Sequence, residues 1–272
     1  MTDADDILQR IPDTARASLD ALEWFAQLES TSSWLKQQAS PPRGRFRAVI
    51  AEHQTAGRGR NEKIWLSPPS SGVCLSVSYT FGDLPRNLPA LTLAIGIGIA
   101  EALQKLGARD VALKWPNDLI AAGRKLGGIL TEIQSAGDDG GRTVVVGIGV
   151  NVDLPDSIRY AAPTAWTSGI SDLAGCMDGV PDRAELAAVI IAALIDSIRR
   201  FESEGLAALR SRWRAYDWLQ GKTVSVQQAA GDITGVADGI DEDGALLVKT
   251  DAGTERVMSG SVRVAAYREV CA

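Results

Sequence analysis

The chain has 272 residues and a formal net charge of -6, with 45% hydrophobic and 23% charged residues. This length fits one or two domains with a sizeable core, and the composition is that of an ordinary globular protein. The negative charge argues against general nucleic-acid binding, so any site for a polyanion has to be a local basic patch.

Cysteine and histidine usage narrows the chemistry. The three cysteines, Cys74, Cys176 and Cys271, are far apart and show no metal-ligand spacing, which fits a reducing cytoplasm. His53 is the single histidine, which excludes a His-rich metal site and any His-dependent triad not built on it. The acidic first ten residues do not read as a signal peptide, and the most apolar run, 93–100, is far shorter than the roughly 20 residues that span a bilayer. We therefore expect a soluble, cytoplasmic protein.

The first 20 residues are predicted to be a partly flexible segment, with a short amphipathic helix near 15–22. A strand over 24–28 follows and ends at a run of hydroxyl residues. Ser30 to Ser32 are predicted to cap a helix over 34–39. A helix N-terminus is also a ready anion site, so capping and ligand binding both remain open for these residues.

A predicted strand over 46–52 leads into the loop 54–63, which reads QTAGRGRNEK. Its glycines, Gly57 and Gly59, allow the backbone to approach a ligand closely. Its arginines, Arg58 and Arg60, offer a planar fork of donors that suits carboxylate and phosphate. Taken alone, the GRGR sequence fits an exposed basic turn better than a binding site.

Hydrophobic periodicity predicts the elements that follow. Apolar residues at helical spacing over 87–107 indicate a long helix with one buried face, and its two glycines suggest close packing against a sheet. A hairpin-type loop is predicted at 135–141. The remaining strands of this region are predicted at 73–81, 111–114, 126–133 and 143–152.

The pattern changes toward the C-terminus. Asp182 is predicted to cap a long helix, and a second helix follows at about 205–219. From there to residue 268 we expect five short strands that form a small barrel, with turns at Gly231-Asp232, Asp238-Gly239, Asp243-Gly244 and Ala252-Gly253. The predicted domains are 21–220 and 221–272, preceded by the segment 1–20.

Polar clusters follow several of the predicted strands. Besides the 54–63 loop they are 114–118 (KWPND), 125–128 (KLGG) and 147–151 (GIGVN). The last lacks the third glycine of a dinucleotide motif, and no Walker motif is present. In isolation, the lysine at the start of KLGG fits a turn, whereas the one that opens KWPND alternates within an apolar strand and needs a partner there.

These clusters bring together four cations and one carboxylate. The cations are Arg58, Arg60, Lys114 and Lys125, and the carboxylate is Asp118. A single exposed ion pair contributes only ~0–1 kcal/mol, so one cation could not hold a triphosphate, whereas several that converge on a closed site could. The set suits an anhydride or phosphate substrate with a divalent metal.

The chain resembles the bacterial biotin protein ligases. The resemblance rests on ST at 30–31, QTAGRGR at 54–60, KWPND at 114–118, KLGGIL at 125–130 and GIGVN at 147–151, in that order. It implies an α+β fold: a mixed sheet with flanking helices, similar to class II aminoacyl-tRNA synthetases, then a small SH3-like β-barrel. Some relatives carry an N-terminal DNA-binding domain. Only about 20 residues precede the first strand here, fewer than the ~50 of a small domain, so a monofunctional enzyme that binds no DNA is predicted.

The resemblance also implies a two-step reaction. Biotin and ATP first give biotinyl-5′-AMP and pyrophosphate, with Mg²⁺. A lysine of a biotin carboxyl carrier domain of an acyl-CoA carboxylase then takes the biotinyl group, and AMP leaves. We expect no membrane association, and a monomer or weak homodimer.

Site residues are carried over from the matching motifs. Biotin is expected to contact Ser30, Thr31, Ser32, Gln54, Gly57, Arg58, Gly59, Arg60, Lys125 and Gly128. ATP is expected to contact Arg60, Trp65, Lys114, Asn117, Asn151 and Arg263. The catalytic set is Lys125, Arg58, Arg60, Lys114 and Asp118, in which Asp118 accepts or orients the proton of the incoming amine. No residue is assigned as a metal ligand.

The chain departs from the family pattern at two places. The family often has Asn where this chain has Ser32. Its loop often continues Arg-Gly-Arg where this chain reads Asn61-Glu62-Lys63, so a carboxylate replaces a glycine in what we expect to be a lid. Two other functions stay open at this point: a lipoate or octanoate ligase on the same scaffold, and a biotin-binding module that has lost ligation.

Overall fold

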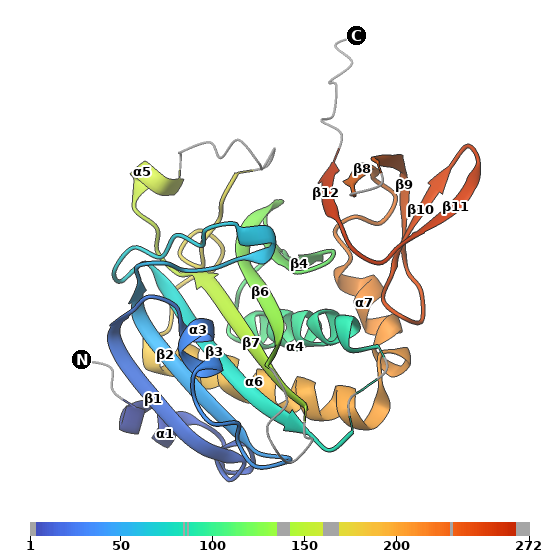
Figure 1. The fold of residues 1–272 in the computed structure, drawn as a ribbon. Coiled ribbons are helices and arrows are strands. Elements are labelled where there is room, and N and C mark those ends of the chain that lie inside the picture. Colours follow the sequence, from blue (N-terminus) through green and yellow to red (C-terminus); the bar gives the residue numbers. More distant parts are fainter. Residues whose placement is uncertain are drawn as a thin grey trace.

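The computed structural model describes residues 4–83, 85, 87–134, 142–159, 169–228 and 231–264. Within these residues the strands form two sheets, one of seven strands and one of five (Figure 1). The loop predicted at 135–141 and the cysteine at 271 lie outside the described residues.

The seven-stranded sheet is mixed. Its strands, in spatial order, are β1 (Leu19–Leu28), β2 (Phe46–Gln54), β3 (Gly72–Phe81), β7 (Arg142–Asn151), β6 (Arg124–Gln134), β5 (Asp118–Ala121) and β4 (Val111–Lys114). β1 and β2 are parallel, and every other neighbouring pair is antiparallel. β3 and β7 are buried along almost their whole length. The near-continuous apolar run of β7 is typical of a strand covered on both faces, whereas β3 alternates apolar residues with buried hydroxyl residues.

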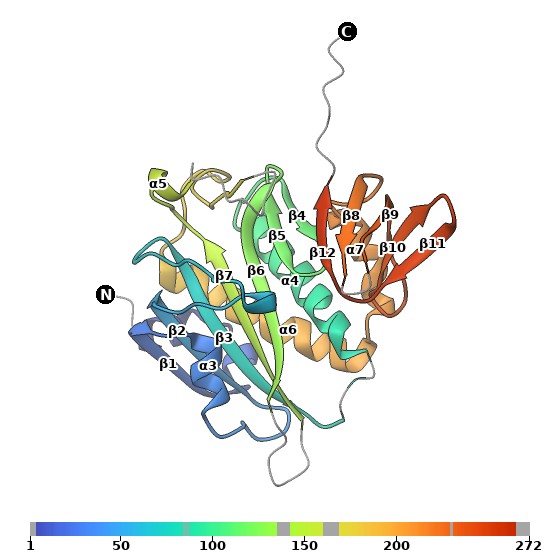
Figure 2. The ribbon, with the colours of Figure 1, turned by 45° about the horizontal axis from the view of Figure 1, so that its top comes forward.

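Helices cover both faces of this sheet. α4 (Leu91–Lys105), preceded by η2 (Leu88–Ala90), and α6 (Arg183–Glu204) pack side by side on one face, and α3 (Thr31–Lys36) lies on the other (Figure 1). The predicted cap of α6 is confirmed, because Asp182 accepts a hydrogen bond from the Glu185 amide at 2.9 Å. The face that carries α3 is also crossed by the chain between β2 and β3 (Figure 2).

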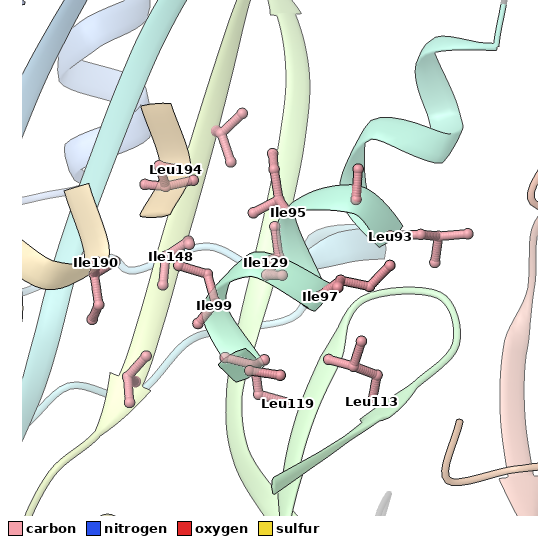
Figure 3. Packing of buried hydrophobic residues seen from close by; sticks show 14 of the residues in the cluster. Leu93, Ile95, Ile97, Ile99, Leu113, Leu119, Ile129, Ile148, Ile190 and Leu194 are labelled. Carbon is pink, nitrogen blue, oxygen red and sulfur yellow. The ribbon is translucent and has the colours of Figure 1, made fainter. Parts of the chain in front are cut away.

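α4 is the centre of the hydrophobic core. Figure 3 shows the α4 side chains Ile95, Ile97 and Ile99 among residues of the sheet and of α6. A Cβ on Gly98 would lie 2.0 Å from Ser197 Oγ of α6, so this glycine permits a close approach of helix to helix, whereas a Cβ on Gly96 would lie 3.3 Å from Leu113 of the sheet. The window Leu88–Lys105 is long and apolar enough to span a membrane by length and composition alone, but 61% of it is buried inside the protein.

The five-stranded sheet follows η3 (Ala207–Leu209) and α7 (Arg210–Tyr216). Its strands, in spatial order, are β11 (Gly253–Val257), β10 (Leu246–Thr250), β9 (Ile233–Ile240), β8 (Thr223–Gln227) and β12 (Ser261–Val264), all paired antiparallel. The buried indole of Trp115 donates to the Gly244 carbonyl at 3.0 Å. The Trp218 amide donates to the Leu113 carbonyl at 2.9 Å. The first bond ties the KWPND segment to the connection between β9 and β10, and the second ties β4 to the chain that leads into the second sheet.

The N-terminal segment differs from the prediction. Residues expected to be partly flexible form α1 (Ala4–Arg10) and α2 (Asp13–Arg16), and β1 already begins at Leu19, inside the helix predicted at 15–22. Ile7 and Ile11 are 0% and 2% exposed and belong to the main core. Two isoleucines four positions apart share one helical face. This spacing was overlooked because the acidic residues around it made the segment look polar.

Two further predictions about strands were wrong. β5 was missed because KWPND was interpreted as the end of β4, whereas the chain turns there and runs back. Asp238-Gly239 was predicted as a turn but lies inside β9, where the pairing with β10 changes register and Gly239 has a φ of +83°. A glycine with positive φ in a strand accommodates such a bulge.

If α1 is part of the core, Ile7→Ala should lower the free energy of unfolding in urea by about 2–5 kcal/mol, the usual cost of such a truncation in a packed site. Gln9→Ala on the exposed face of the same helix is the control and should change it by less than about 0.5 kcal/mol. Equal and small effects of both substitutions would contradict the placement of α1.

Candidate functional site

A cleft of about 660 Å³ lies against β6 and β7, beneath the chain that joins β2 to β3. The β4–β5 turn and β12 of the second sheet complete its walls. Every site residue predicted from the sequence except Gly57 lines it: Ser30, Thr31, Ser32, Gln54, Arg58, Gly59, Arg60, Trp65, Lys114, Asn117, Asp118, Lys125, Gly128, Asn151 and Arg263. Six separate segments of the chain therefore meet at one place.

One end of the cleft is a buried network of hydroxyls and one amide. Thr31 donates to Gln54 Oε1 from its backbone N–H (2.8 Å) and from its hydroxyl (3.1 Å). The hydroxyls of Thr31 and Ser32 lie 2.7 and 3.0 Å from Ser76 Oγ. These residues are all at most 9% exposed, so their polar groups are held in fixed directions. Sequence reasoning missed Ser76; the alternation of Ser76, Ser78 and Thr80 in an otherwise apolar strand is the signal that could have found it.

Ser30 caps α3, as predicted. Its Oγ accepts from the Ser33 amide at 3.3 Å, and the helix begins at Thr31 rather than at residue 34. Because the cap fixes the first turn, Thr31 and Ser32 point into the cleft from a rigid element.

Glycines make room for Trp65. A Cβ on Gly149 would lie 2.3 Å from Trp65 Cε2, so the indole rests directly on the backbone of β7. Gly57 is outside the lining of the cleft, but a Cβ there would lie 2.5 Å from the Trp65 carbonyl oxygen. The GIGVN motif therefore forms a floor for an aromatic ring, and the first glycine of GRGR lets the loop fold back past Trp65.

The other end of the cleft is cationic. Lys125 Nζ lies 2.5 Å from Asp118 Oδ1 and 5.8 Å from the centroid of the Trp65 ring. Lys114 is only 8% exposed, and burial lowers its pKa to about 8, opposed by Asp118 and reinforced by Lys125 and Lys63. Burial also lowers the pKa of Arg60, again opposed by Asp118. Three cations thus share one carboxylate, which leaves a net positive end suited to a polyanion.

The two arginines of GRGR point to different places. The Arg60 guanidinium lies 3.4 Å from Asn117 Oδ1, beside the cationic end. Arg58 instead donates to Glu132 Oε1 at 2.7 Å and to Ser33 Oγ at 3.2 Å. The structure therefore brings Arg60, Lys114, Lys125 and Asp118 together and holds the Arg58 side chain apart from them.

The two predicted asparagines hold backbone segments in place. Asn117 Nδ2 donates to the Ile129 carbonyl, and Asn151 Nδ2 donates to the Ser171 carbonyl, both at 2.9 Å. These bonds fix the β4–β5 turn against β6 and the end of β7 against the chain near residue 171. The side-chain oxygen of Asn117 faces the cationic end, where it accepts a hydrogen bond from Arg60.

The loop that covers the cleft contains two consecutive residues in the left-handed region, within η1 (Arg60–Glu62). Asn61 has a φ of 54° and Glu62 a φ of 59°. Asn tolerates this region, whereas Glu is destabilised there by roughly 1 kcal/mol, a cost that a glycine at this position would avoid. The departure noted in the sequence therefore places a local strain in the middle of the loop.

The depressed pKa of Lys114 has a consequence for stability. Between pH 8 and 10.5 the unfolded chain carries a proton at this lysine that the folded chain has lost. The free energy of unfolding should therefore rise with pH across this window, by on the order of 2 kcal/mol. Urea unfolding of wild type and Lys114→Met measures it, because the variant should lack this rise. Identical profiles for the two proteins, or an Nζ resonance that titrates near 10.5, would contradict the burial of this cation.

Two family models match the chain, one over part of the seven-stranded sheet and one over the five-stranded sheet. Residues 24–153 match the biotin/lipoate A/B protein ligase family, and residues 220–264 match the biotin protein ligase C terminal domain.

Individual relatives agree with these matches. The chain is 37% identical over 219 residues to the Escherichia coli bifunctional ligase/repressor BirA, covering 79% of this chain and 65% of that protein. It is 32% identical over 220 residues to a Mycobacterium tuberculosis biotin–[acetyl-CoA-carboxylase] ligase, covering 79% and 77%. The Aquifex aeolicus biotin protein ligase in complex with biotin and ATP superposes with a TM-score of 0.75 at 26% identity, covering 90% of this chain and 99% of that one.

Proposed function

This chain belongs to the biotin protein ligase family, and from that premise we propose that it joins biotin to ATP as biotinyl-5′-AMP and then passes the biotinyl group to a lysine of a carrier domain. The observation that carries the proposal is the single cleft that joins a buried hydroxyl–amide pocket to a cationic end. A small neutral head group fits the first part, and an acyl phosphate with its nucleotide fits the second.

We assign the head group of biotin to the hydroxyl–amide end. Thr31, Gln54 and Ser76 are already bonded to one another there, so their remaining donors and acceptors are preorganised for a planar ring with both kinds of group. At Gly128 a Cβ would meet Lys125 at 3.6 Å and Trp65 at 3.7 Å, and we assign the chain of the substrate to the space beside these two side chains. Ser32, which replaces the common Asn, is bonded to Ser76 and offers a shorter reach.

In the first step an oxygen of the biotin carboxylate attacks the α-phosphorus of ATP, and pyrophosphate leaves. The protein must hold the biotin carboxylate and the ATP phosphates close together although they repel each other. The cations of the cleft offset this repulsion and stabilise the transition state, so they are expected to determine the rate. We assign Lys125 to the carboxylate and α-phosphate, and Lys114 and Arg60 to the phosphates. Trp65 and Asn151 are assigned to the nucleoside and Arg263 of β12 to the nucleotide.

In the second step a lysine amine of the carrier attacks the acyl carbon of the mixed anhydride, and AMP leaves with the bonding electron pair. The amine must lose a proton. Two carboxylates, Glu62 and Asp118, line the cleft among the described residues, and Asp118 is the one whose ion pair with Lys125 keeps it close to the anhydride. We therefore assign to Asp118 the acceptance or orientation of that proton.

Mg²⁺ belongs to this proposal as a partner of the nucleotide. The described residues contain no group of three or more His, Cys, Asp or Glu side chains that could hold a metal. Magnesium at nucleotide sites is usually bound by one or two carboxylates together with phosphate oxygens and water. Asp118 is the cleft carboxylate that fits this role, and the ion would neutralise phosphate charge beside Lys114.

The fold is a mixed sheet with helices and a C-terminal sheet, as in biotin protein ligases. We further propose that the first part is of the class II aminoacyl-tRNA-synthetase type, that the second is an SH3-like barrel, and that the boundary lies near residue 220. The M. tuberculosis relative is named for acetyl-CoA carboxylase, which favours the carrier domain of such an enzyme as the partner, in the cytoplasm.

Release of pyrophosphate tests the proposal directly. It should require biotin and ATP together, and mass spectrometry should then show biotin on one lysine of an apo carrier domain. Lipoate is the matched alternative substrate, since the first family match includes lipoate ligases. Modification by lipoate alone would favour that second function, and binding of biotin without pyrophosphate release would indicate a non-catalytic module.

Lys125→Ala removes the cation at the junction of carboxylate and phosphate. The rate of adenylate formation should fall by about 100-fold or more, because a charge-assisted contact made in the transition state is lost. Lys105→Ala at the end of α4, outside the cleft, is the control and should keep the wild-type rate. A Lys125→Ala variant with an unchanged pyrophosphate rate would refute the assigned role.

A further inference from the structure

Glu132 is a charged residue of β6 that lies outside the lining of the cleft and that no step of the proposed reaction uses. Its Oε1 accepts from Arg58 Nη2 at 2.7 Å and from Lys36 Nζ at 2.9 Å. Its side chain is only 18% exposed. Among the described residues, its second oxygen is buried and has no hydrogen-bond partner. A carboxylate in this position is stabilised mainly by the two cations it faces.

The Arg58 guanidinium connects three elements. It extends from the covering loop and donates two hydrogen bonds, one to Ser33 of α3 and one to Glu132 of β6. β6 rises roughly 3.3 Å per residue, so Glu132 stands on the order of 20 Å along the strand from Lys125. While it is bound to Glu132, Arg58 cannot share a phosphate with Lys125.

The backbone of the same loop is held by few bonds of its own. The Thr55 and Ala56 amides donate to the Leu28 and Glu29 carbonyls, both at 2.9 Å, and so fix the chain up to residue 56. Beyond it, the amides of Gly59, Lys63 and Trp65 bond only within the loop, to the carbonyls of Lys63, Arg60 and Gly57. Ile64 and Leu66 are 77% and 66% exposed, so packing contributes little to the position of the loop outside Trp65. A side-chain anchor at the start of the loop therefore has a large influence on where the loop lies.

We propose that Glu132 is a positioning residue: through Arg58 it fastens the start of the β2–β3 loop to β6 and α3, and Arg58 acts as the anchor of this loop and not as a phosphate ligand. The backbone from Arg58 to Arg60 is then presented to the cleft in a fixed place, and Arg60 alone of the two arginines reaches the cationic end. The consequence for catalysis rests on the proposed function, whereas the consequence for loop opening does not.

The test uses Glu132→Gln, Arg58→Gln and the double variant in the full chain. Hydrogen exchange of the amides of residues 57–65 without substrate should be about fivefold faster in each single variant, and no faster in the double variant than in either single one. The half-life of bound adenylate should shorten by a similar factor in all three. Arg58→Gln changes a side chain that is 43% exposed, so it tests the contact without disturbing β6.

Lys36→Gln is the matched control. It removes the other cation bound to Glu132 Oε1 and leaves the contact with Arg58. Loop exchange should then stay within about twofold of wild type. An effect as large as that of Glu132→Gln would mean that Glu132 acts by tying α3 to β6, and would overturn the proposal.

Two other outcomes would also overturn it. Additive effects in the double variant would show that Arg58 and Glu132 act independently. Tighter substrate binding in Glu132→Gln together with weaker binding in Arg58→Gln would show that Glu132 merely withholds Arg58 from the substrate. If wild type forms no adenylate, the proposed function fails, but the exchange data still decide whether Glu132 anchors the loop.

Discussion

The site depends on one carboxylate that is shared by three largely buried cations. Asp118 begins β5, directly opposite Lys114 at the end of β4, and its side chain meets Lys125 near the start of β6. Burial lowers the pKa of Lys114 and of Arg60, and Asp118 partly offsets this effect for both. Without a ligand, the positive charges at the cationic end are therefore unfavourable, because they are buried and repel each other. A bound polyanion would lower this electrostatic energy. The strands must hold the lysines in place against their mutual repulsion.

The rest of the fold supplies that rigidity. α4 packs its isoleucines under β4, β5 and β6, so the backbone that carries the lysines has little freedom to move apart. Trp115, within the same motif, is buried and bonded to Gly244 of the second sheet. The C-terminal sheet thus braces the β4–β5 turn in addition to contributing Arg263 to the cleft. This gives a physical reason why a small second sheet accompanies the larger one.

Much of this could be predicted from the sequence, because the signals were local. Apolar runs and helical spacing placed most strands and both long helices, and every site residue carried over from the resemblance except Gly57 lines the cleft. Contacts between distant segments were beyond such reasoning. Ser76 is an ordinary polar residue of a strand until α3 is packed above it, and Glu132 becomes important only when Lys36 and Arg58 arrive from two other elements. The core role of α1 was missed for the same reason, since Ile7 is meaningful only against α6.

The covering loop shows how two opposing demands are met in one segment. In the proposed reaction it leaves the cleft to admit substrate and returns to exclude water from a reactive anhydride. Trp65 on Gly149 and Arg58 on Glu132 hold it down at two points, whereas Glu62 in the left-handed region raises the energy of the stretch between them. We expect a loop that is fixed at its ends and strained in its middle to open by releasing one contact rather than by unfolding. On the proposed roles, Glu62 shifts the balance toward opening, and the anchor at Glu132 shifts it back.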